Sequence, residues 1–150
     1  MRRVVRRSVR ALLIDDDGRL VLIKRTKPGE DPYWTTPGGG VEADDPSLVA
    51  ALTRELAEEL GAEAAAFEQV FLATTPHADG VAVQHFFLCQ LVALDEAGRH
   101  GPEFDDPSRG GYDIDRVAVA EVGGVALKPD LLRDFIVANT EALLTANAVG

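Results

Sequence analysis

The stretch that decides the fold covers residues 34–61 and reads WTTPGGGVEADDPSLVAALTRELAEELG. Its first part holds a proline and three successive glycines, which is typical of a backbone that bends sharply or is approached closely. In its second part, leucine and valine recur at the spacing of one helix face. We therefore expect a helix that ends at Leu60, with Asp45 as its N-cap, Pro46 in its first turn and Gly61 as its C-terminal stop.

The acidic residues of this helix break its amphipathic pattern. Glu55 and Glu59 fall within or beside the apolar face, Glu58 lies near its edge, and Arg54 is among the most outward positions. Like charges at these spacings repel each other, and half-buried carboxylates are costly unless they are paired or bind a cation. The pattern favours a site for a hard cation, Mg²⁺ or Mn²⁺. The alternative is a solvated acidic face with Arg54 as a local partner.

The glycines just before the helix add to this interpretation. A glycine turn at residues 38–40 can aim backbone carbonyls at a metal or backbone N–H groups at a phosphate. A metal that bridges phosphate oxygens to carboxylates is a common arrangement in phosphoryl transfer.

The rest of the chain predicts strands and one more helix. Hydrophobic alternation and turn residues predict strands over residues 4–14, 20–23, 67–75, 81–94 and 112–120, and a final helix over residues 130–146. A long loop rich in glycine, proline and acids covers residues 95–111. We expect a single α/β domain over residues 1–150, built as a mixed sheet with helices at two separated places.

The charge and composition of the chain limit the classes of partner that it can bind. The net charge is −10, although residues 1–30 hold nine Lys or Arg against four Asp or Glu. The acidic remainder disfavours a stable nucleic-acid partner, but a small phosphorylated ligand could bind through divalent cations. We interpret the early arginines as a solvated strand face; a nucleic-acid arm is the alternative. No apolar run approaches the roughly 20 residues of a membrane span, so we expect a cytoplasmic protein without a membrane partner.

The motif formed by residues 38–62 resembles that of the Nudix hydrolase superfamily. Its box reads G, five residues, E, seven residues, then R-E-U-x-E-E-x-G-U, where U is a bulky aliphatic residue. Residues 54–62 match the second half, except that Ala62 is small, and residues 38–42 look like the first half. There is one departure: five residues from Gly39 lead to Asp45, and eight then separate Asp45 from Arg54. We interpret this as a one-residue insertion with Asp45 in place of the box glutamate.

The resemblance implies an α/β/α sandwich and a metal-dependent reaction. It implies hydrolysis of a diphosphate linkage in a nucleoside diphosphate derivative, by attack of a metal-activated water on phosphorus. Carried over by position, the implied metal ligands are Glu55, Glu58, Glu59 and the carbonyl of Gly38, and the implied catalytic residues are Glu55, Glu58 and Arg54. Glu55 could also orient or deprotonate the water, while Arg54 would hold Glu55 by an ion pair. Many members are homodimers, so a homodimer is a further expectation.

Several other residues are candidates at the site. In the long loop, Glu103 is our candidate for an additional metal ligand, with a plain solvated acid as the alternative. We expect Gly39, Gly40, Arg25 and Trp34 to contact substrate; the alternatives are a surface arginine and a packed tryptophan.

Three other functions compete with this hypothesis. The first is a catalytically silent Nudix-like domain that binds a nucleotide and regulates another activity. The second is an enzyme similar to isopentenyl-diphosphate isomerase, which would need an activated cysteine, whereas Cys89 lies in an apolar strand. The third is an interaction module whose acidic helix docks a basic partner.

Overall fold

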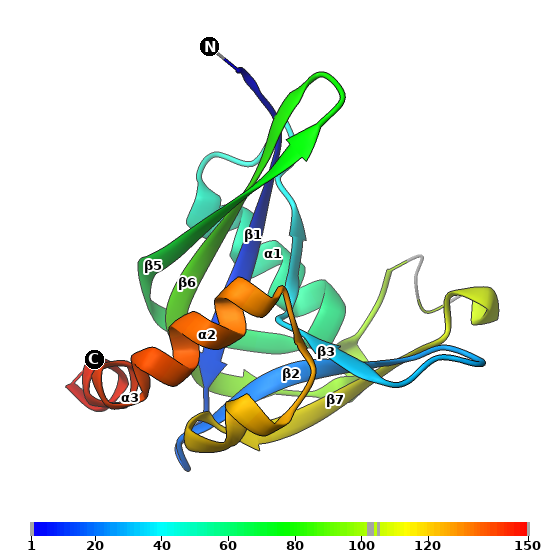
Figure 1. Cartoon of the computed structure of the whole chain (residues 1–150). Coiled ribbons are helices and arrows are strands. Elements are labelled where there is room, and N and C mark those ends of the chain that lie inside the picture. The colour runs from blue at the N-terminus through cyan, green and yellow to red at the C-terminus, as the bar shows by residue number, and fades with distance from the viewer. Residues whose placement is uncertain (1, 102–103, 105, 150) are drawn as a thin grey trace.

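A curled mixed sheet lies at the centre of the computed structural model, which describes residues 2–101, 104 and 106–149 (Figure 1). Within those residues eight strands follow the order β5-β6-β1-β2-β3-β8, with β4 beside β1 and β7 beside β2. Their bounds are β1 Val4–Ile14, β2 Arg19–Thr26, β3 Tyr33–Thr35, β4 Gly38–Gly40, β5 Ala62–His77, β6 Gly80–Leu94, β7 Gly111–Ala118 and β8 Leu127–Lys128. The pairs β1–β6 and β3–β8 are parallel, and the other pairs are antiparallel.

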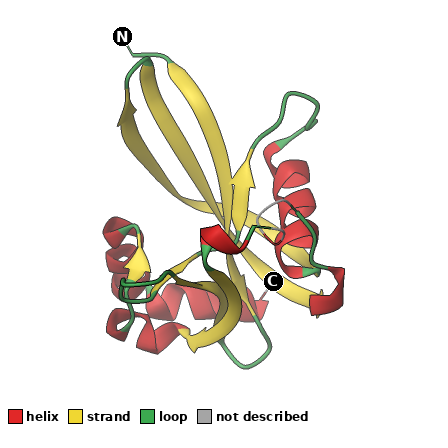
Figure 2. Cartoon of the chain, turned by 90° about the vertical axis from the view of Figure 1, so that its right-hand side faces the viewer, coloured by secondary structure: helices red, strands yellow, loops and turns green. Residues whose placement is uncertain are grey.

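Helices cover both faces of the sheet (Figure 2). One face carries α1 (Leu48–Leu60), and the other carries α2 (Asp130–Ala138) and α3 (Thr140–Val149). The 3-10 turns are η1 (Glu96–Gly98), η3 (Pro107–Arg109) and η4 (Val119–Gly124). The predicted α/β/α sandwich with a mixed sheet is confirmed. Among the described residues, no helix has both the length and the apolar character needed to cross a membrane.

The strand β1 supplies side chains to two separate cores. Val9, Ala11 and Leu13 pack with the leucines of α1, whereas Leu12 and Ile14 pack in the cluster that includes α2. Successive side chains of a strand point to opposite faces, so one strand can serve both layers. This alternation fixes which face of β1 is turned towards α1.

The first turn of the chain is fixed by the buried side chain of Asp15. Its carboxylate accepts hydrogen bonds from the backbone N–H groups of Asp17 and Arg19, each at 2.9 Å. It also pairs with the guanidinium groups of Arg19 at 3.0 Å and Arg116 at 2.9 Å. Burial alone would raise the pKa of Asp15, but these hydrogen bonds outweigh it and lower the pKa.

The start of α1 differs from the expectation. Asp45 is not the N-cap: Ser47 takes that place, and its hydroxyl accepts a hydrogen bond from the N–H of Ala50 at 3.0 Å. The helix then begins at Leu48, two residues after Pro46. Gly61 does end the helix, with φ 65°, and a Cβ there would lie 1.9 Å from the carbonyl oxygen of Asp95. Glycine is therefore required at this end.

Two further elements also differ in extent. The strand β5 begins at Ala62, directly after Gly61, rather than at Phe67, and its pairing with β6 shifts register at three places. The final helix is interrupted at Asn139. There the side-chain amide of Asn139 donates to the carbonyl of Phe135 at 2.8 Å, a local hydrogen bond that competes with helix continuation.

Candidate active site

A cleft of about 580 Å³ brings most of the candidate residues together. Its wall includes four glutamates and five arginines among the described residues: Glu42, Glu55, Glu58, Glu59, Arg6, Arg10, Arg25, Arg54 and Arg109. The three glycines of β4 also line it. Because these residues come from β1, β2, β4, α1 and η3, the cleft exists only in the folded chain.

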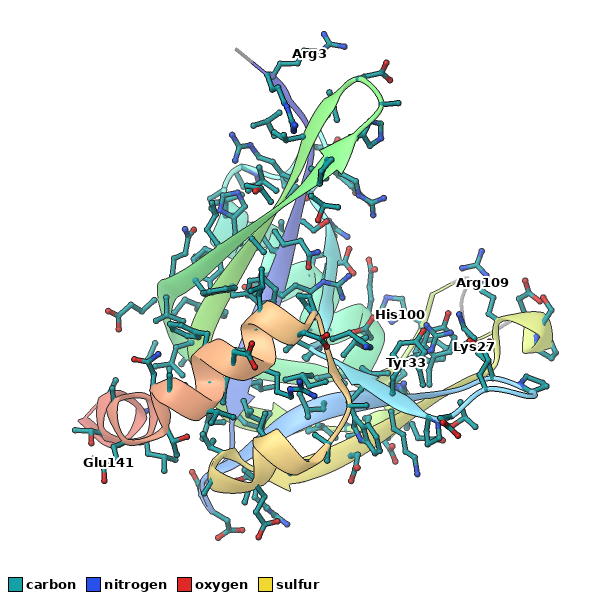
Figure 3. The ribbon with its side chains drawn as sticks, in the orientation of Figure 1. Arg3, Lys27, Tyr33, His100, Arg109 and Glu141 are labelled. Carbon is teal, nitrogen blue, oxygen red and sulfur yellow. The ribbon has the colours of Figure 1, made fainter. Side chains whose placement is uncertain are left out.

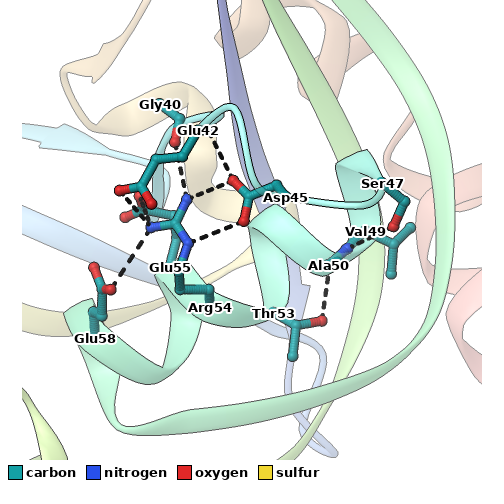
Figure 4. Close-up of polar contacts among 10 residues, drawn as sticks. All are labelled: Gly40, Glu42, Asp45, Ser47, Val49, Ala50, Thr53, Arg54, Glu55 and Glu58. Atoms are coloured by element: carbon teal, nitrogen blue, oxygen red, sulfur yellow. Dashed lines mark hydrogen bonds and ion pairs between the residues drawn. The ribbon is translucent and has the colours of Figure 1, made fainter.

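Arg54 is at the centre of the acidic wall (Figure 4). Its guanidinium contacts both carboxylate oxygens of Asp45, at 2.8 and 3.2 Å, and the carbonyl of Gly40 at 3.2 Å. The same group pairs with Glu55 at 2.9 Å and lies 3.6 Å from Glu58. The position on the helix wheel suggested an outward side chain, and this was wrong, because the long side chain turns back over the start of the helix. The ion pair with Glu55 is present as expected.

These contacts change the acidity of the groups involved. The hydrogen bond from Arg54 lowers the pKa of Asp45, and Asp45 in turn raises the pKa of Arg54. Asp45 thus has a partner on α1 although it is not the helix cap. It ties the loop after β4 to the helix and fixes the arginine that holds Glu55.

Glu55 lies directly against the glycine strand. A Cβ added to Gly39 would come within 2.5 Å of the Glu55 carboxyl carbon, so only a glycine leaves room for this carboxylate. The side chain of Glu55 is 15% exposed. Burial raises its pKa, and the ion pair with Arg54 opposes that effect.

Glu59 is held by the backbone of the same strand. The N–H of Gly38 donates to its carboxylate at 3.1 Å. Gly38 has φ 149°, and a Cβ at this position would lie 2.0 Å from the carbonyl oxygen of Val9. The positive φ and the close approach of β1 both require glycine here.

The acidic residues of the cleft are of the type that binds metals, but their side chains are not grouped around one metal position. Within the described ranges, no three acidic, histidine or cysteine side chains form a group that could hold a metal ion. Glu55 and Glu58 face Arg54, and Glu59 accepts from Gly38. Carboxylate oxygens are nevertheless the ligands that Mg²⁺ and Mn²⁺ prefer, so the donor set fits once these flexible side chains turn. The remaining candidate, Glu103, is outside the described residues.

Arg25 forms another part of the cleft together with a residue that the sequence did not suggest. Its guanidinium stacks 3.7 Å from the ring centroid of Tyr112, its partner in the β2–β7 pairing. It also donates to the backbone carbonyls of Arg109 at 2.6 Å and Gly111 at 3.1 Å. Figure 3 shows Arg109 at the same end of the molecule as Lys27, far from the C-terminal helices.

Trp34 is not part of the cleft. Its indole N–H donates to the carboxylate of Asp115 at 2.8 Å, and its ring packs against the core cluster on the α2 side of the sheet. The structure shows the packing alternative for this side chain, and the expected substrate contact stays a prediction. Cys89 is also buried, and burial raises the pKa of its thiol to about 12.

Three arginines among the described residues of the cleft were missed at the level of sequence, namely Arg6, Arg10 and Arg109. Arg6 and Arg10 both lie on β1, where they looked like members of a solvated strand face. Arg10 instead donates to the carbonyl of Thr36 at 3.1 Å. The signal was weak, because alternation along a strand gives the face of a side chain but not the element that it meets.

Comparison with known proteins agrees with this geometry. A family model described as NUDIX domain matches residues 4–130. Comparison with curated proteins gives no match. A NUDIX hydrolase from Nitrosomonas europaea is 17% identical, with a TM-score of 0.68 over 91% of this chain and 88% of its own. The MutT NUDIX hydrolase from Burkholderia pseudomallei is 27% identical, with a TM-score of 0.54 over 76% of this chain and 83% of its own.

A third solved structure has a similar fold. The NUDIX domain of Shewanella oneidensis NrtR, solved as a complex with ADP ribose, is 20% identical, with a TM-score of 0.64 over 92% of this chain and 87% of its own. The family match covers far more than half of the chain and includes the glycine strand, the acidic helix and most of the cleft. The chain therefore belongs to the Nudix family and is a Nudix-type pyrophosphohydrolase.

Proposed function

We propose that this chain hydrolyses the diphosphate linkage of a nucleoside diphosphate derivative in a reaction that depends on Mg²⁺ or Mn²⁺. The observation that carries the proposal is the meeting of Glu55, Glu58 and Glu59 with the glycine strand in one cleft. The ADP ribose in the Shewanella oneidensis domain supports the same class of ligand, since ADP ribose contains a diphosphate.

The charges of the cleft suit a diphosphate. Five arginines accompany four glutamates among the described residues of the cleft, although the whole chain carries a net charge of −10. Among the described residues, Arg25 is held by Tyr112 and two backbone carbonyls rather than by an acid, so its charge is available to phosphate oxygens. The cleft can therefore attract an anion that most of the protein surface would repel.

The carboxylates of α1 would hold the metal. Bound Mg²⁺ or Mn²⁺ would neutralise phosphate charge and lower the pKa of an attacking water. Glu55, Glu58, Glu59 and the carbonyl of Gly38 are the proposed ligands.

The remaining steps belong to the chain's own groups. Glu55 is proposed to orient the water and accept its proton, because the side chain is confined by Gly39 on one side and by Arg54 on the other. Arg54 itself is fixed by Asp45, so the position of Glu55 depends on both. Gly39 and Gly40 leave the backbone open to a phosphate, and the reaction then needs mainly alignment and charge stabilisation.

The test is metal-dependent hydrolysis across a panel of substrates. The panel holds ADP ribose, nucleotide sugars, dinucleoside polyphosphates, and normal and oxidised nucleoside triphosphates, each with Mg²⁺, Mn²⁺ or EDTA. Glu59→Gln should lose turnover, whereas Glu63→Gln, which removes an exposed acid of β5, should keep it. Turnover that survives EDTA, or equal turnover in the two variants, would contradict the proposal.

Tight binding of ADP ribose in calorimetry without turnover on any substrate would contradict the proposed reaction and would support the silent regulatory domain instead. A homodimer, a cytoplasmic location and a single domain over residues 1–150 stay predictions; light scattering of the purified chain tests the first.

A further inference from the structure

Arg10 approaches the acidic helix from the opposite side of the glycine strand. It pairs with Gly38 in the β1–β4 ladder, and by alternation it shares the face of β1 that carries Leu12 and Ile14. The helix α1 packs against the other face of β1. The strand between them consists of glycines, which contribute no side chains, and the guanidinium and the carboxylates line the same cleft.

Arg10 differs from Arg54 in how its charge is used. Arg54 forms ion pairs with four carboxylates. Arg10, by contrast, donates a hydrogen bond to the neutral carbonyl of Thr36. Burial lowers the pKa of Arg10, while the nearby charges of Glu59 and Glu55 oppose that effect.

A half-buried cation in this place has two consequences. It compensates the repulsion among the α1 carboxylates when no other cation is present. It also repels any divalent cation that approaches the same carboxylates, and the repulsion is weakly screened because the group is partly withdrawn from solvent.

We propose that Arg10 is a positioning residue whose fixed charge holds Glu55 and Glu59 in the metal-free protein and lowers the affinity of that protein for divalent cations. The inference rests on the proposed function, because it takes these glutamates as metal ligands. A phosphate group that enters the cleft offsets the charge of Arg10. Anionic substrate and metal therefore bind with positive coupling, and each raises the affinity for the other by the same factor.

Removal of the charge of Arg10 tests this inference without an activity measurement. Arg10→Gln keeps an N–H donor for the carbonyl of Thr36 but loses the charge. Titration of the substrate-free variant with Mn²⁺, followed by electron paramagnetic resonance, should show binding about tenfold tighter than in the wild type. Loss of a merely structural contact would loosen the site and weaken binding instead.

Two control variants separate charge from shape. Arg10→Lys keeps the charge, so its Mn²⁺ affinity should stay within about twofold of the wild type. Arg6→Gln removes a cleft arginine whose side chain is exposed, and solvent screening should limit the change to about twofold. Tighter binding in Arg10→Lys would overturn the proposal, since charge is the stated cause.

The Mn²⁺ affinity of the wild type tests the proposed function, and that of the variant tests the inference about Arg10. Folding is checked by circular dichroism and by the melting temperature with and without Mn²⁺, and the gain from saturating Mn²⁺ should be larger in Arg10→Gln. Unchanged or weaker Mn²⁺ binding in folded Arg10→Gln would overturn this inference alone. Absence of Mn²⁺ binding by the wild type would instead contradict the proposed function.

Discussion

Gly39→Ala places one methyl group where the carboxylate of Glu55 now lies. The added Cβ would be 2.5 Å from the carboxyl carbon and from one of its oxygens. An ordinary contact is about 3.5 Å, so the carboxylate must move by about 1 Å. The backbone of Gly39 does not have the positive φ that alanine avoids, and the clash is with the end of a flexible side chain rather than with backbone. The fold should therefore survive while Glu55 is displaced.

A displacement of about 1 Å in a positioned group can cost about 100-fold in rate, which corresponds to about 2.7 kcal/mol in the activation barrier. We expect kcat of Gly39→Ala to fall by about this factor on whichever substrate the panel identifies, with a melting temperature within about 2 °C of the wild type.

The neighbouring glycine provides the matched control for this substitution. A Cβ at Gly40 meets only the guanidinium of Arg6, at 3.9 Å, which is open enough for a methyl group. Gly40→Ala should therefore lose less than about threefold in kcat, and any loss of the proposed phosphate contact at Gly40 should raise KM instead. Equal losses in the two variants, or a wild-type kcat in folded Gly39→Ala, would refute the argument that the missing side chain of Gly39 positions Glu55.

Three further predictions follow from local contacts. Ser47→Ala removes the helix cap and should lower the free energy of unfolding by about 1 kcal/mol with little effect on kcat. Asp45→Asn should lower kcat more than stability, because Arg54 loses its ion pair with Asp45. Urea unfolding and steady-state kinetics compare the two variants. The folded-state pKa of Asp15 is lowered, so its ionised form stabilises the fold above about pH 4, and this contribution disappears as the pH falls through the lowered value. Asp15→Asn should therefore lower the free energy of unfolding by about 2 kcal/mol at pH 7 and by less at pH 3, as measured by urea unfolding. Cys89 should react with iodoacetamide only after unfolding, because its thiol is buried and its pKa is raised to about 12, and rapid labelling of the folded chain would contradict this.

The acidic helix was predictable from sequence because its signals are local. The apolar spacing, the glycine stop and the carboxylate cluster all lie within residues 46–61, and the helix ends at Leu60 as expected. Its start was missed by two positions, because the helix begins at Leu48 rather than at Pro46. Asp45 and Ser47 are both good N-caps, and the decision depended on the ion pairs between Asp45 and Arg54, which form only when the loop folds back on the helix.

The part of the cleft that lies beyond the helix could not be read from sequence. Tyr112 reaches Arg25 through the β2–β7 register, and the two residues are 87 positions apart in the chain. Arg10 reaches the acids only because β4 inserts beside β1. Both contacts depend on pairing between distant strands, which residue-by-residue patterns do not specify. The break at Asn139 was missed because apolar residues continue on both sides of it.

The side-chain alternation of β1 limits where residues can be inserted into this chain or deleted from it. Deletion of one residue between Ser8 and Arg10 would invert the orientation of the strand on one side of the gap. Either Leu12 and Ile14 would exchange cores with Leu13, or the cleft would lose its guanidinium. Insertions and deletions can be absorbed in the turn between β5 and β6, where the chain is exposed, but not in this strand. Relatives of this protein should therefore vary in the length of the β5–β6 hairpin while they keep the number of residues in β1 constant.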